Sequence, residues 1–219
     1  MRIAVFISGR GTNLKALLAA AAREDFPGEI ALVISNRPDA PGLQFAKKAG
    51  VQQAVVDHKG FESREDFEAA LNDALNHANI DLICLAGFMR ILTEDFVNRW
   101  RGRMLNIHPS LLPAFRGLNV HDRMIAAGVK IAGCTVHFVS PEMDAGPIIG
   151  QASLTVPPTD NAETLAARIL TLENELYPAC LKLIVDKRAR LSGSVVRIDE
   201  KLSHEAEVYN PIPISQQPD

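Results

Sequence analysis

The chain opens with MRIAVFISGRGTNL, in which the apolar run Ile3–Ile7 leads into Ser8-Gly-Arg-Gly-Thr-Asn13. A short apolar run followed by glycines is typical of a buried strand that ends in a tight turn. The helical pattern of residues 13–23 follows at once, so the N-terminus of this helix, with its backbone N–H groups, would face the turn. Free N–H groups and a partial positive charge at that point suit one phosphate. An ordinary turn with Thr12 or Asn13 as N-cap explains the same residues, because the third glycine of a dinucleotide fingerprint and the lysine of a P-loop are absent.

The alternation of apolar strand and helix continues through the first half of the chain. Strands are predicted at 3–7, 30–34, 51–56, 82–86 and 104–107, and helices at 13–23, 42–49, 63–78 and 94–100. Capping side chains three residues before an acid, Ser63 before Asp66 and Asp160 before Glu163, indicate two helix starts. This rhythm predicts an α/β fold, a Rossmann-like open sheet that is mostly parallel and twisted, with helices on both faces.

The pattern changes after Pro113. Two extended stretches, 135–139 and 148–156, are joined through the turn-rich residues 141–147 and predict a strand pair, so the C-terminal part of the sheet should be mixed or antiparallel. A long helix is predicted from about 161 to 185, and Pro178 should kink or interrupt it. One apolar stripe at the helical period marks its buried face: Leu165, Ile169, Leu172, Leu176, Cys180 and Leu183.

Composition excludes several classes of function. The 219 residues hold 23 basic and 26 acidic side chains, for a net charge of −3, and no basic block of the kind that binds nucleic acid. No apolar run approaches the ~20 residues that a membrane crossing needs, and no signal peptide precedes the first strand, so we expect a cytoplasmic protein. The three cysteines, Cys84, Cys134 and Cys180, sit in apolar sequence and are predicted to be buried thiols rather than a disulfide or a catalytic group. No metal-site spacing and no G-x-S-x-G elbow are found.

Asn106 and His108 lie two residues apart at the end of the strand predicted at 104–107. Alternation places both side chains on one face of the sheet, at the carboxyl edge where open α/β sheets bind their ligands. An amide donor beside an imidazolium would stabilise an oxyanion that develops on a carbonyl, and histidine can also move a proton. A strand-end asparagine and a structurally hydrogen-bonded histidine are the alternative interpretation.

Two acids outside this strand also stand out. Asp144 lies in a turn-rich loop, where a solvated turn former is the ordinary explanation. If the loop folds back over the sheet edge, its carboxylate would contact His108, orient the ring and favour its charged form. Glu173 falls inside the apolar stripe of the long helix, where a carboxylate is costly unless it is paired. Ligand hydroxyls, a salt bridge or an extended side chain at the edge would each satisfy it.

Four motifs taken together resemble the phosphoribosylglycinamide formyltransferases, a folate-dependent family. They are Ser8-Gly-Arg-Gly-Thr-Asn-Leu14, Leu85-Ala-Gly-Phe-Met-Arg-Ile-Leu92, Asn106-Ile-His-Pro-Ser-Leu-Leu-Pro113 and Met143-Asp-Ala-Gly-Pro147. The similarity spans roughly residues 1–185 in the right order. It implies one formyltransferase domain at 1–188, with a nucleotide-binding half (about 1–100) and a catalytic and folate half (about 101–188). Residues 189–219 would then be a C-terminal extension, and 210–219, with three prolines, is predicted to be a frayed tail.

The resemblance also implies roles for individual residues. Asn106, His108 and Asp144 would be the catalytic trio that transfers a formyl group from 10-formyltetrahydrofolate, as co-substrate and without a metal, to the amine of glycinamide ribonucleotide. The ribonucleotide would be bound by Gly11, Thr12, Asn13, Gly87, Pro109 and Glu173. The folate would be bound by Arg64, Met89, Arg90, Ile91, Leu92, Val139, Ser140, Pro141, Glu142 and Met143. Thr12 stands where serine is common, and Leu170 stands where some relatives carry a polar residue near the nucleotide.

The expected mechanism is direct attack of the amine on the formyl carbon, with the oxyanion between Asn106 and a protonated His108 and a bell-shaped pH profile. A 10-formyltetrahydrofolate hydrolase and a non-catalytic nucleotide-binding sensor are the competing hypotheses. Methionyl-tRNA formyltransferase would need a further RNA-binding domain and a basic surface. Among partners we expect only the two small substrates, no nucleic acid and no membrane, and a monomer or weak homodimer.

Overall fold

A computed structural model of the chain describes residues 1–199. Its centre is a seven-stranded sheet with the strand order β3-β2-β1-β4-β5-β6-β7. The strands are β1 (Arg2–Ile7), β2 (Glu29–Ser35), β3 (Gln52–Val55), β4 (Leu82–Leu85), β5 (Met104–His108), β6 (Ile131–Phe138) and β7 (Ile148–Thr155). The first five pair in parallel, and β6 and β7 are antiparallel. The predicted α/β fold with a mixed C-terminal part is confirmed, and the predicted strands agree with the observed ones to within a few residues at their ends.

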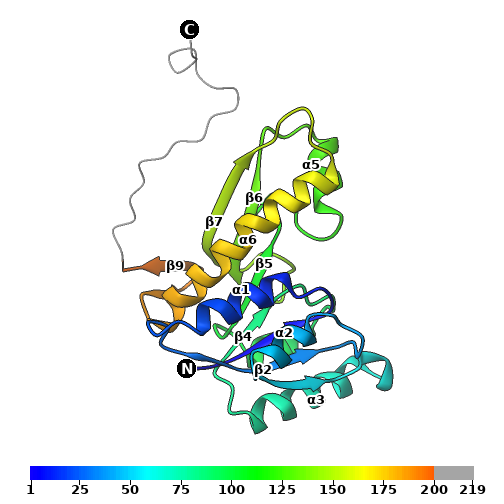
Figure 1. The fold of residues 1–219 in the computed structure, drawn as a ribbon, viewed down its shortest axis with the longest axis vertical. Helices are drawn as coiled ribbons and strands as arrows, with labels where there is room; N and C mark the ends of the chain where they lie inside the picture. Colours follow the sequence, from blue (N-terminus) through cyan, green and yellow to red (C-terminus); the bar gives the residue numbers. More distant parts are fainter. Residues whose placement is uncertain (200–219) are drawn as a thin grey trace.

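Helices cover both faces of the sheet. They are α1 (Thr12–Ala21), α2 (Leu43–Lys48), α3 (Arg64–His77), α4 (Glu94–Arg99), α5 (Val120–Ala126) and α6 (Ala162–Val185). Apolar residues of α1, α2 and the second half of α6 pack with one face of the sheet, and those of α3 and α4 pack with the other. A third cluster joins α5, β6 and the first half of α6. Figure 1 shows α1 and α6 side by side over the sheet, with α3 at the far end.

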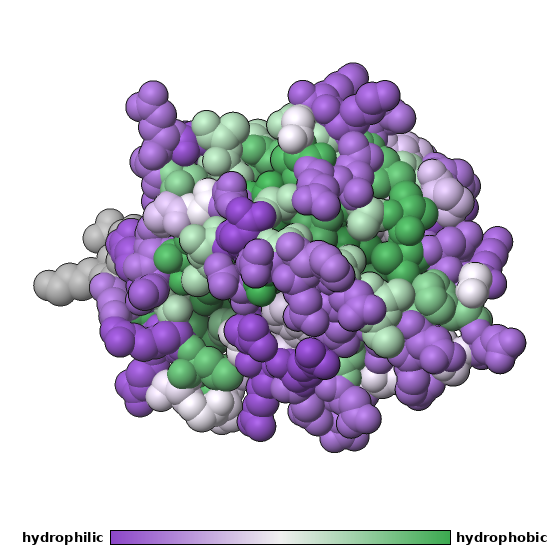
Figure 2. Space-filling view, turned by 90° about the horizontal axis from the view of Figure 1, so that it is seen from below, coloured by the Kyte–Doolittle hydropathy of each residue, from purple (hydrophilic) through white to green (hydrophobic). Residues whose placement is uncertain are grey.

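Alternation along the parallel strands produces the two cores. Ile3, Val5 and Ile7 of β1 belong to the cluster under α1, whereas Ala4 and Phe6 belong to the cluster under α3. Every one of these side chains is fully buried, which explains why the strand is an unbroken apolar run. On the outside, the face seen from the α3 end of the molecule is mostly hydrophilic, with smaller hydrophobic areas between the polar side chains (Figure 2).

The long helix departs from expectation at two places. α6 is one continuous helix through Pro178, so the expected interruption is wrong. Tyr177, Cys180 and Leu181 on either side of the proline are buried against the same sheet, and this packing outweighs the ~3 kcal/mol that an internal proline costs. The expected cap at Asp160 is also wrong, since Asn161 accepts from the amides of Glu163 and Thr164. Asp160 instead forms an ion pair with Arg168, which lies in the second turn of the helix.

The C-terminal extension holds a hairpin that the sequence patterns did not predict. Strands β8 (Ala189–Ser192) and β9 (Val195–Ile198) pair antiparallel, and Ala189, Leu191, Val196 and Ile198 pack on the core that α6 covers. The prediction for residues 210–219 lies outside the described residues.

The prediction for the cysteines is confirmed. Cys84, Cys134 and Cys180 are free and buried, and burial raises the pKa of each thiol to about 12, so none is a reactive thiolate. In residues 1–199, no helix combines the length and the apolarity that spanning a membrane requires.

Candidate active site

The strand order places the site at a topological switch point. β2 and β3 lie on one side of β1, and β4 lies on the other, so the chain leaves the carboxyl ends of β1 and β4 in opposite directions. Ligands of open α/β sheets bind in the crevice that this reversal opens. Two predicted binding segments begin at these strand ends, the turn at 8–13 and the loop at 87–92.

The turn after β1 leaves the start of α1 open. Gly11 is the N-cap, with φ of 73°, and no side chain among residues 1–199 caps the helix. The alternative in which Thr12 or Asn13 caps the helix is therefore wrong, because both residues already lie inside it. The amides of the first turn remain available to an anion.

Gly11 is fixed by backbone conformation and by close packing at once. A Cβ atom added there would lie 2.6 Å from Cα of Gly42, whereas one added at Gly9 would meet nothing within 4 Å. We expect Gly11→Ala to lower the free energy of unfolding by roughly 2 kcal/mol or more, since strain at positive φ and a backbone clash combine. Gly9→Ala, the matched control, should change it by less than about 1 kcal/mol. Urea unfolding of both variants measures the difference, and equal values would contradict this account of the turn.

Asn13 and Glu173 meet beside this turn. Nδ2 of Asn13 donates to Oε2 of Glu173 over 2.8 Å, and both side chains are buried. The partner of the acid within the described residues is therefore a neutral amide from α1 rather than a basic side chain, and binding of ligand hydroxyls stays a prediction. Burial raises the pKa of the Glu173 carboxyl, and the hydrogen bond from Asn13 opposes that shift. Oδ1 of Asn13 is buried without a hydrogen-bond partner within residues 1–199, so an acceptor remains for a ligand donor.

The raised pKa of Glu173 makes stability depend on pH. The folded protein holds the proton more tightly than the unfolded chain, so the charged carboxylate lowers stability at neutral pH, and this penalty vanishes as the pH falls below the ordinary pKa of 4.5. We therefore expect Glu173→Gln to be more stable than the parent at neutral pH and to lose that advantage in acid. Unfolding followed across pH measures it, with Glu175→Gln, on the exposed side of α6, as the control. A neutral-pH advantage shared by both variants would count against the assignment.

Three residues predicted to be catalytic come together over β5 and β6. Asn106 and His108 lie on the same face of β5, and the loop after β6 brings Asp144 over that face. Oδ2 of Asp144 is 3.4 Å from Nδ1 of His108, and both side chains are almost entirely buried. The same oxygen accepts from the amide of Gly117 over 2.9 Å, which holds the carboxylate in place. Asp144 itself has φ of 51°, in the left-handed region, which aspartate tolerates better than most residues.

His137 is a fourth member of this cluster that the sequence analysis missed. It pairs with Asn106 in the β5–β6 register, and Nδ2 of Asn106 lies 3.2 Å from its Nε2. Nε2 also lies 3.8 Å from Oδ1 of Asp144. Nδ1 lies 2.9 Å from the Phe138 carbonyl oxygen, which only accepts, so Nδ1 carries the proton and Nε2 is free to accept from Asn106. Burial lowers the pKa of the His137 ring, which favours this neutral form.

The other nitrogen of His108 faces the loop after β5. Nε2 lies 2.9 Å from the carbonyl oxygen of Phe115, so it too carries a proton. His108 is thus held at both ring nitrogens, by a carbonyl on one side and by the Asp144 carboxylate on the other. The loops that supply these two contacts are joined to each other by an ion pair between Arg116 and Glu142.

The residues predicted to bind folate lie in three segments. Arg64 begins α3, residues 89–92 follow β4, and residues 139–143 follow β6. Met89 and Ile91 are 71% and 61% exposed, an unusual display of large apolar side chains. Leu92 and Val139 pack on the core under α3, and Ser140 donates to the Glu142 carbonyl. Pro141 and Met143 are exposed in the same loop.

Arg64 and Arg90 share a cavity of about 150 Å³. His58, Phe61, Glu62, Ser63 and Phe67 line the rest of it. Two guanidinium groups beside aromatic walls suit an anionic ligand with an apolar body. This cavity therefore brings together two of the residues predicted to bind folate.

The remaining predicted residues are placed by their elements. Gly87, with φ of 74°, follows β4, and Pro109 follows β5, both at the carboxyl edge of the sheet. Leu170 is half-buried on α6, three residues before Glu173. Within residues 1–199, no group of three or more histidine, cysteine or acidic side chains has the arrangement of a metal site.

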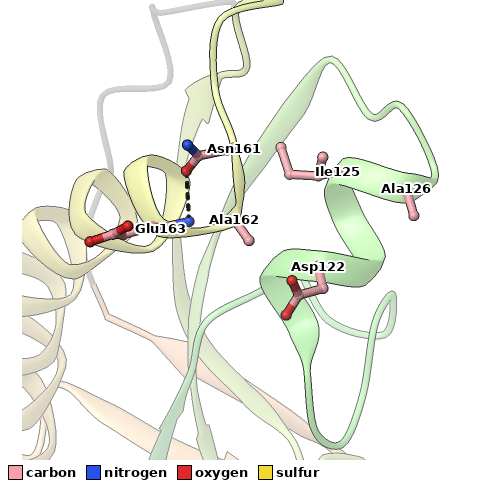
Figure 3. A pocket seen from close by; sticks show the side chains of 6 residues that line it. All are labelled: Asp122, Ile125, Ala126, Asn161, Ala162 and Glu163. Atoms are coloured by element: carbon pink, nitrogen blue, oxygen red, sulfur yellow. Dashed lines mark hydrogen bonds between the residues drawn. The ribbon is translucent and has the colours of Figure 1, made fainter.

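A larger cavity, of about 440 Å³, lies away from all of these residues. Figure 3 shows it between α5 and the start of α6, where it is lined by Asp122, Ile125 and Ala126 from α5 and by Asn161, Ala162 and Glu163 from the start of α6. The Asn161 side chain already caps α6 there through the Glu163 amide, over 2.9 Å. No predicted binding or catalytic residue lines this cavity.

Comparison with known proteins agrees with the geometry. The family model described as formyl transferase matches residues 1–181. Phosphoribosylglycinamide formyltransferase of Haemophilus influenzae is 44% identical over 91% of this chain and 94% of that protein. The crystal structure of glycinamide ribonucleotide transformylase 1 from Symbiobacterium toebii is 46% identical and superposes with a TM-score of 0.88, over 90% of this chain and 93% of that one.

A longer relative contains the same unit. The trifunctional purine biosynthetic protein adenosine-3 of Gallus gallus is 47% identical over 84% of this chain, which spans only 18% of that protein's length.

Proposed function

Because this chain belongs to the formyl transferase family, we propose that it transfers the formyl group of 10-formyltetrahydrofolate to the amine of glycinamide ribonucleotide, a step of purine biosynthesis. The names of relatives that this chain matches over more than nine-tenths of their length support this reaction. The observation that carries the proposal is the 3.4 Å approach of the Asp144 carboxylate to Nδ1 of His108. A carboxylate and an imidazole thus meet on one face of the sheet, and alternation along β5 adds the Asn106 amide to the same face.

In this proposal the ribonucleotide lies across the switch point. Its phosphate accepts from the amides at the start of α1, around Gly11, Thr12 and Asn13. Glu173 accepts from ribose hydroxyls, and the unpartnered Oδ1 of Asn13 lies beside it. Gly87 and Pro109 border the path from the phosphate to the trio.

The folate would extend from the trio toward the cavity at Arg64 and Arg90. Its ring system would cover Met89, Ile91 and Met143, which are exposed here, and its carboxylates would meet the two arginines. Folate serves as co-substrate, and no role for a metal is proposed. The division into halves at about residue 100 stays a prediction, because in this assignment each substrate meets residues on both sides of it.

The chemistry is a direct acyl transfer. The lone pair of the substrate amine attacks the formyl carbon, and the carbonyl electrons move onto the oxygen, where donors from Asn106 and His108 stabilise the charge. The bond from that carbon to the folate nitrogen then breaks as the carbonyl re-forms. One proton leaves the attacking nitrogen and one reaches the departing nitrogen, so no proton is consumed. Asp144 would move this proton through a water while it orients the His108 ring.

The hydrogen bond from His108 to Phe115 bears on this step. For Nε2 to meet the formyl oxygen, it has to exchange the Phe115 carbonyl for the ligand. Asp144 can hold the ring through Nδ1 during the exchange, because that contact lies on the opposite side of the imidazole.

Incubation with 10-formyltetrahydrofolate, with and without glycinamide ribonucleotide, tests the proposal. We expect deformylation only when the ribonucleotide is present. Deformylation at the same rate without it would indicate a hydrolase, and ribonucleotide binding without deformylation would indicate a sensor. A cytoplasmic location and a monomeric or weakly dimeric state stay predictions from the sequence.

A further inference from the structure

We infer that Ser8 is a positioning residue for the folate site, acting through a buried chain of hydrogen bonds that fixes two walls of that site. This inference rests on the proposed function. Ser8 is the first residue after β1 and is 5% exposed, and within residues 1–199 its side chain hydrogen-bonds to Asn36 and Met89 rather than to the predicted catalytic residues or the first turn of α1. The folate-site residues themselves, at 89–92 and at the Arg64 cavity, lie at the two ends of the chain of contacts.

Ser8 holds the loop after β4 at two points. Its amide donates to the carbonyl oxygen of Gly87 over 3.2 Å, and its hydroxyl oxygen accepts from the amide of Met89 over 2.7 Å. The loop between them turns at positive φ and presents the exposed Met89 and Ile91 side chains. A loop with so few buried side chains depends on such backbone anchors for its conformation.

The Ser8 hydroxyl also bonds to the residue that follows the neighbouring strand, β2. It donates to Oδ1 of Asn36 over 2.6 Å, in a fully buried bond. Asn36, 2% exposed, follows β2, and its backbone carbonyl oxygen accepts over 2.9 Å from Nδ1 of His58, in the short 3-10 helix His58–Gly60. His58 in turn lines the cavity that Arg64 and Arg90 share.

The chain of contacts therefore joins the apolar wall of the folate site to its basic cavity. Because a serine hydroxyl has one proton and two lone pairs, it can hold Met89 and Asn36 at the same time, which alanine cannot do. Removal of the hydroxyl leaves the Met89 amide and Oδ1 of Asn36 without their hydrogen-bond partner in a buried region. The exposed loop that carries Met89 would then change its conformation. The same change reaches the phosphate turn only through the Ser8 backbone, which alanine retains.

The test is the effect of Ser8→Ala in the full chain on each substrate separately. We expect KM for 10-formyltetrahydrofolate to rise about 5- to 30-fold, the range for one lost buried hydrogen bond, while kcat and KM for the ribonucleotide change by less than about 3-fold. Ser8→Thr, which keeps the hydroxyl, should restore most of the affinity. The dissociation constant of 10-formyltetrahydrofolate alone, by calorimetry, should show the same rise.

Ser35→Ala is the matched control. Ser35 is fully buried at the end of β2, next to Asn36, but in the part of the chain that the structure describes its hydroxyl bonds only with the backbone of Arg37. The Ser35→Ala variant should therefore have the same two KM values as the parent. An unchanged folate KM in Ser8→Ala, or an equal rise of both KM values, or the same rise in Ser35→Ala, would overturn the positioning role.

A second measurement keeps the inference falsifiable if Ser8→Ala does not fold. Hydrogen exchange of the parent protein should be slower at the Met89 amide than at those of Arg90 and Ile91, which have no acceptor in the described part of the chain. Equal exchange at the three amides would overturn the proposal that Ser8 holds the loop after β4. Failure of the proposed function would look different, since the parent protein itself would then show no ribonucleotide-dependent deformylation.

Discussion

Replacing His108 with alanine is expected to lower kcat about 10²- to 10³-fold, the usual loss when one oxyanion donor is removed. Asn106→Ala should have a loss of the same order, because both side chains are donors on the same face of β5. The ribonucleotide should bind both variants as it binds the parent, since its proposed phosphate and ribose contacts lie on α1 and α6. Single-turnover rates and calorimetric binding measure the two effects separately.

His77→Ala is a suitable control for the histidine variant. His77 is exposed in the last turn of α3, where Nδ1 contacts the Asp73 carbonyl oxygen over 2.7 Å, and its loss should leave kcat unchanged. If His108→Ala and Asn106→Ala both kept the parental kcat, direct transfer through these two donors would have to be abandoned.

Replacing Asp144 with asparagine is expected to lower kcat about 10²- to 10⁴-fold, the range seen when a carboxylate that orients a catalytic histidine is made neutral. The asparagine oxygen can still accept from the Gly117 amide, as Oδ2 of Asp144 does, so the loop should keep its place. What is lost is the negative charge 3.4 Å from His108 and 3.8 Å from His137. The Asp144→Asn variant therefore separates the role of charge from that of shape.

Asp95→Asn, at an exposed position on α4, is the control for this second prediction. Measurements of kcat at saturation of both substrates, together with thermal unfolding, compare the two variants. A stable Asp144→Asn protein with the parental kcat would show that the carboxylate has no part in the chemistry.

Local pattern predicted the parallel half of the sheet well. Strands β1, β2 and β4 are largely apolar and buried, and burial on both faces leaves little freedom in their composition. The caps were harder to predict. Ser63 caps α3 as expected, but Asp160, with the same spacing to an acid, pairs with Arg168 instead. Several side chains compete to cap a helix, and the competition is decided by neighbours more than one turn away.

The site divides along the same line. Asn106 and His108 follow from alternation on one strand, which is a local rule. His137 needed the β5–β6 register, since nothing in its own strand marks it as the partner of Asn106. The hairpin of β8 and β9 was missed because its short strands rest on the core under α6, and their own pattern is too brief to indicate pairing.

The sequence by itself determined the alternation of strands and helices from β1 to β5, the glycine turn after β1, and which strand end carries an amide beside an imidazole, because these depend on interactions within a few residues. The tertiary structure alone decided that Asp144 reaches His108, that Asn13 holds Glu173, and that Ser8 holds Met89 and Asn36. Each of these contacts joins residues 28 to 160 positions apart. Such pairs meet only where the packed sheet and its covering helices bring distant segments together, and that packing depends on the whole core at once.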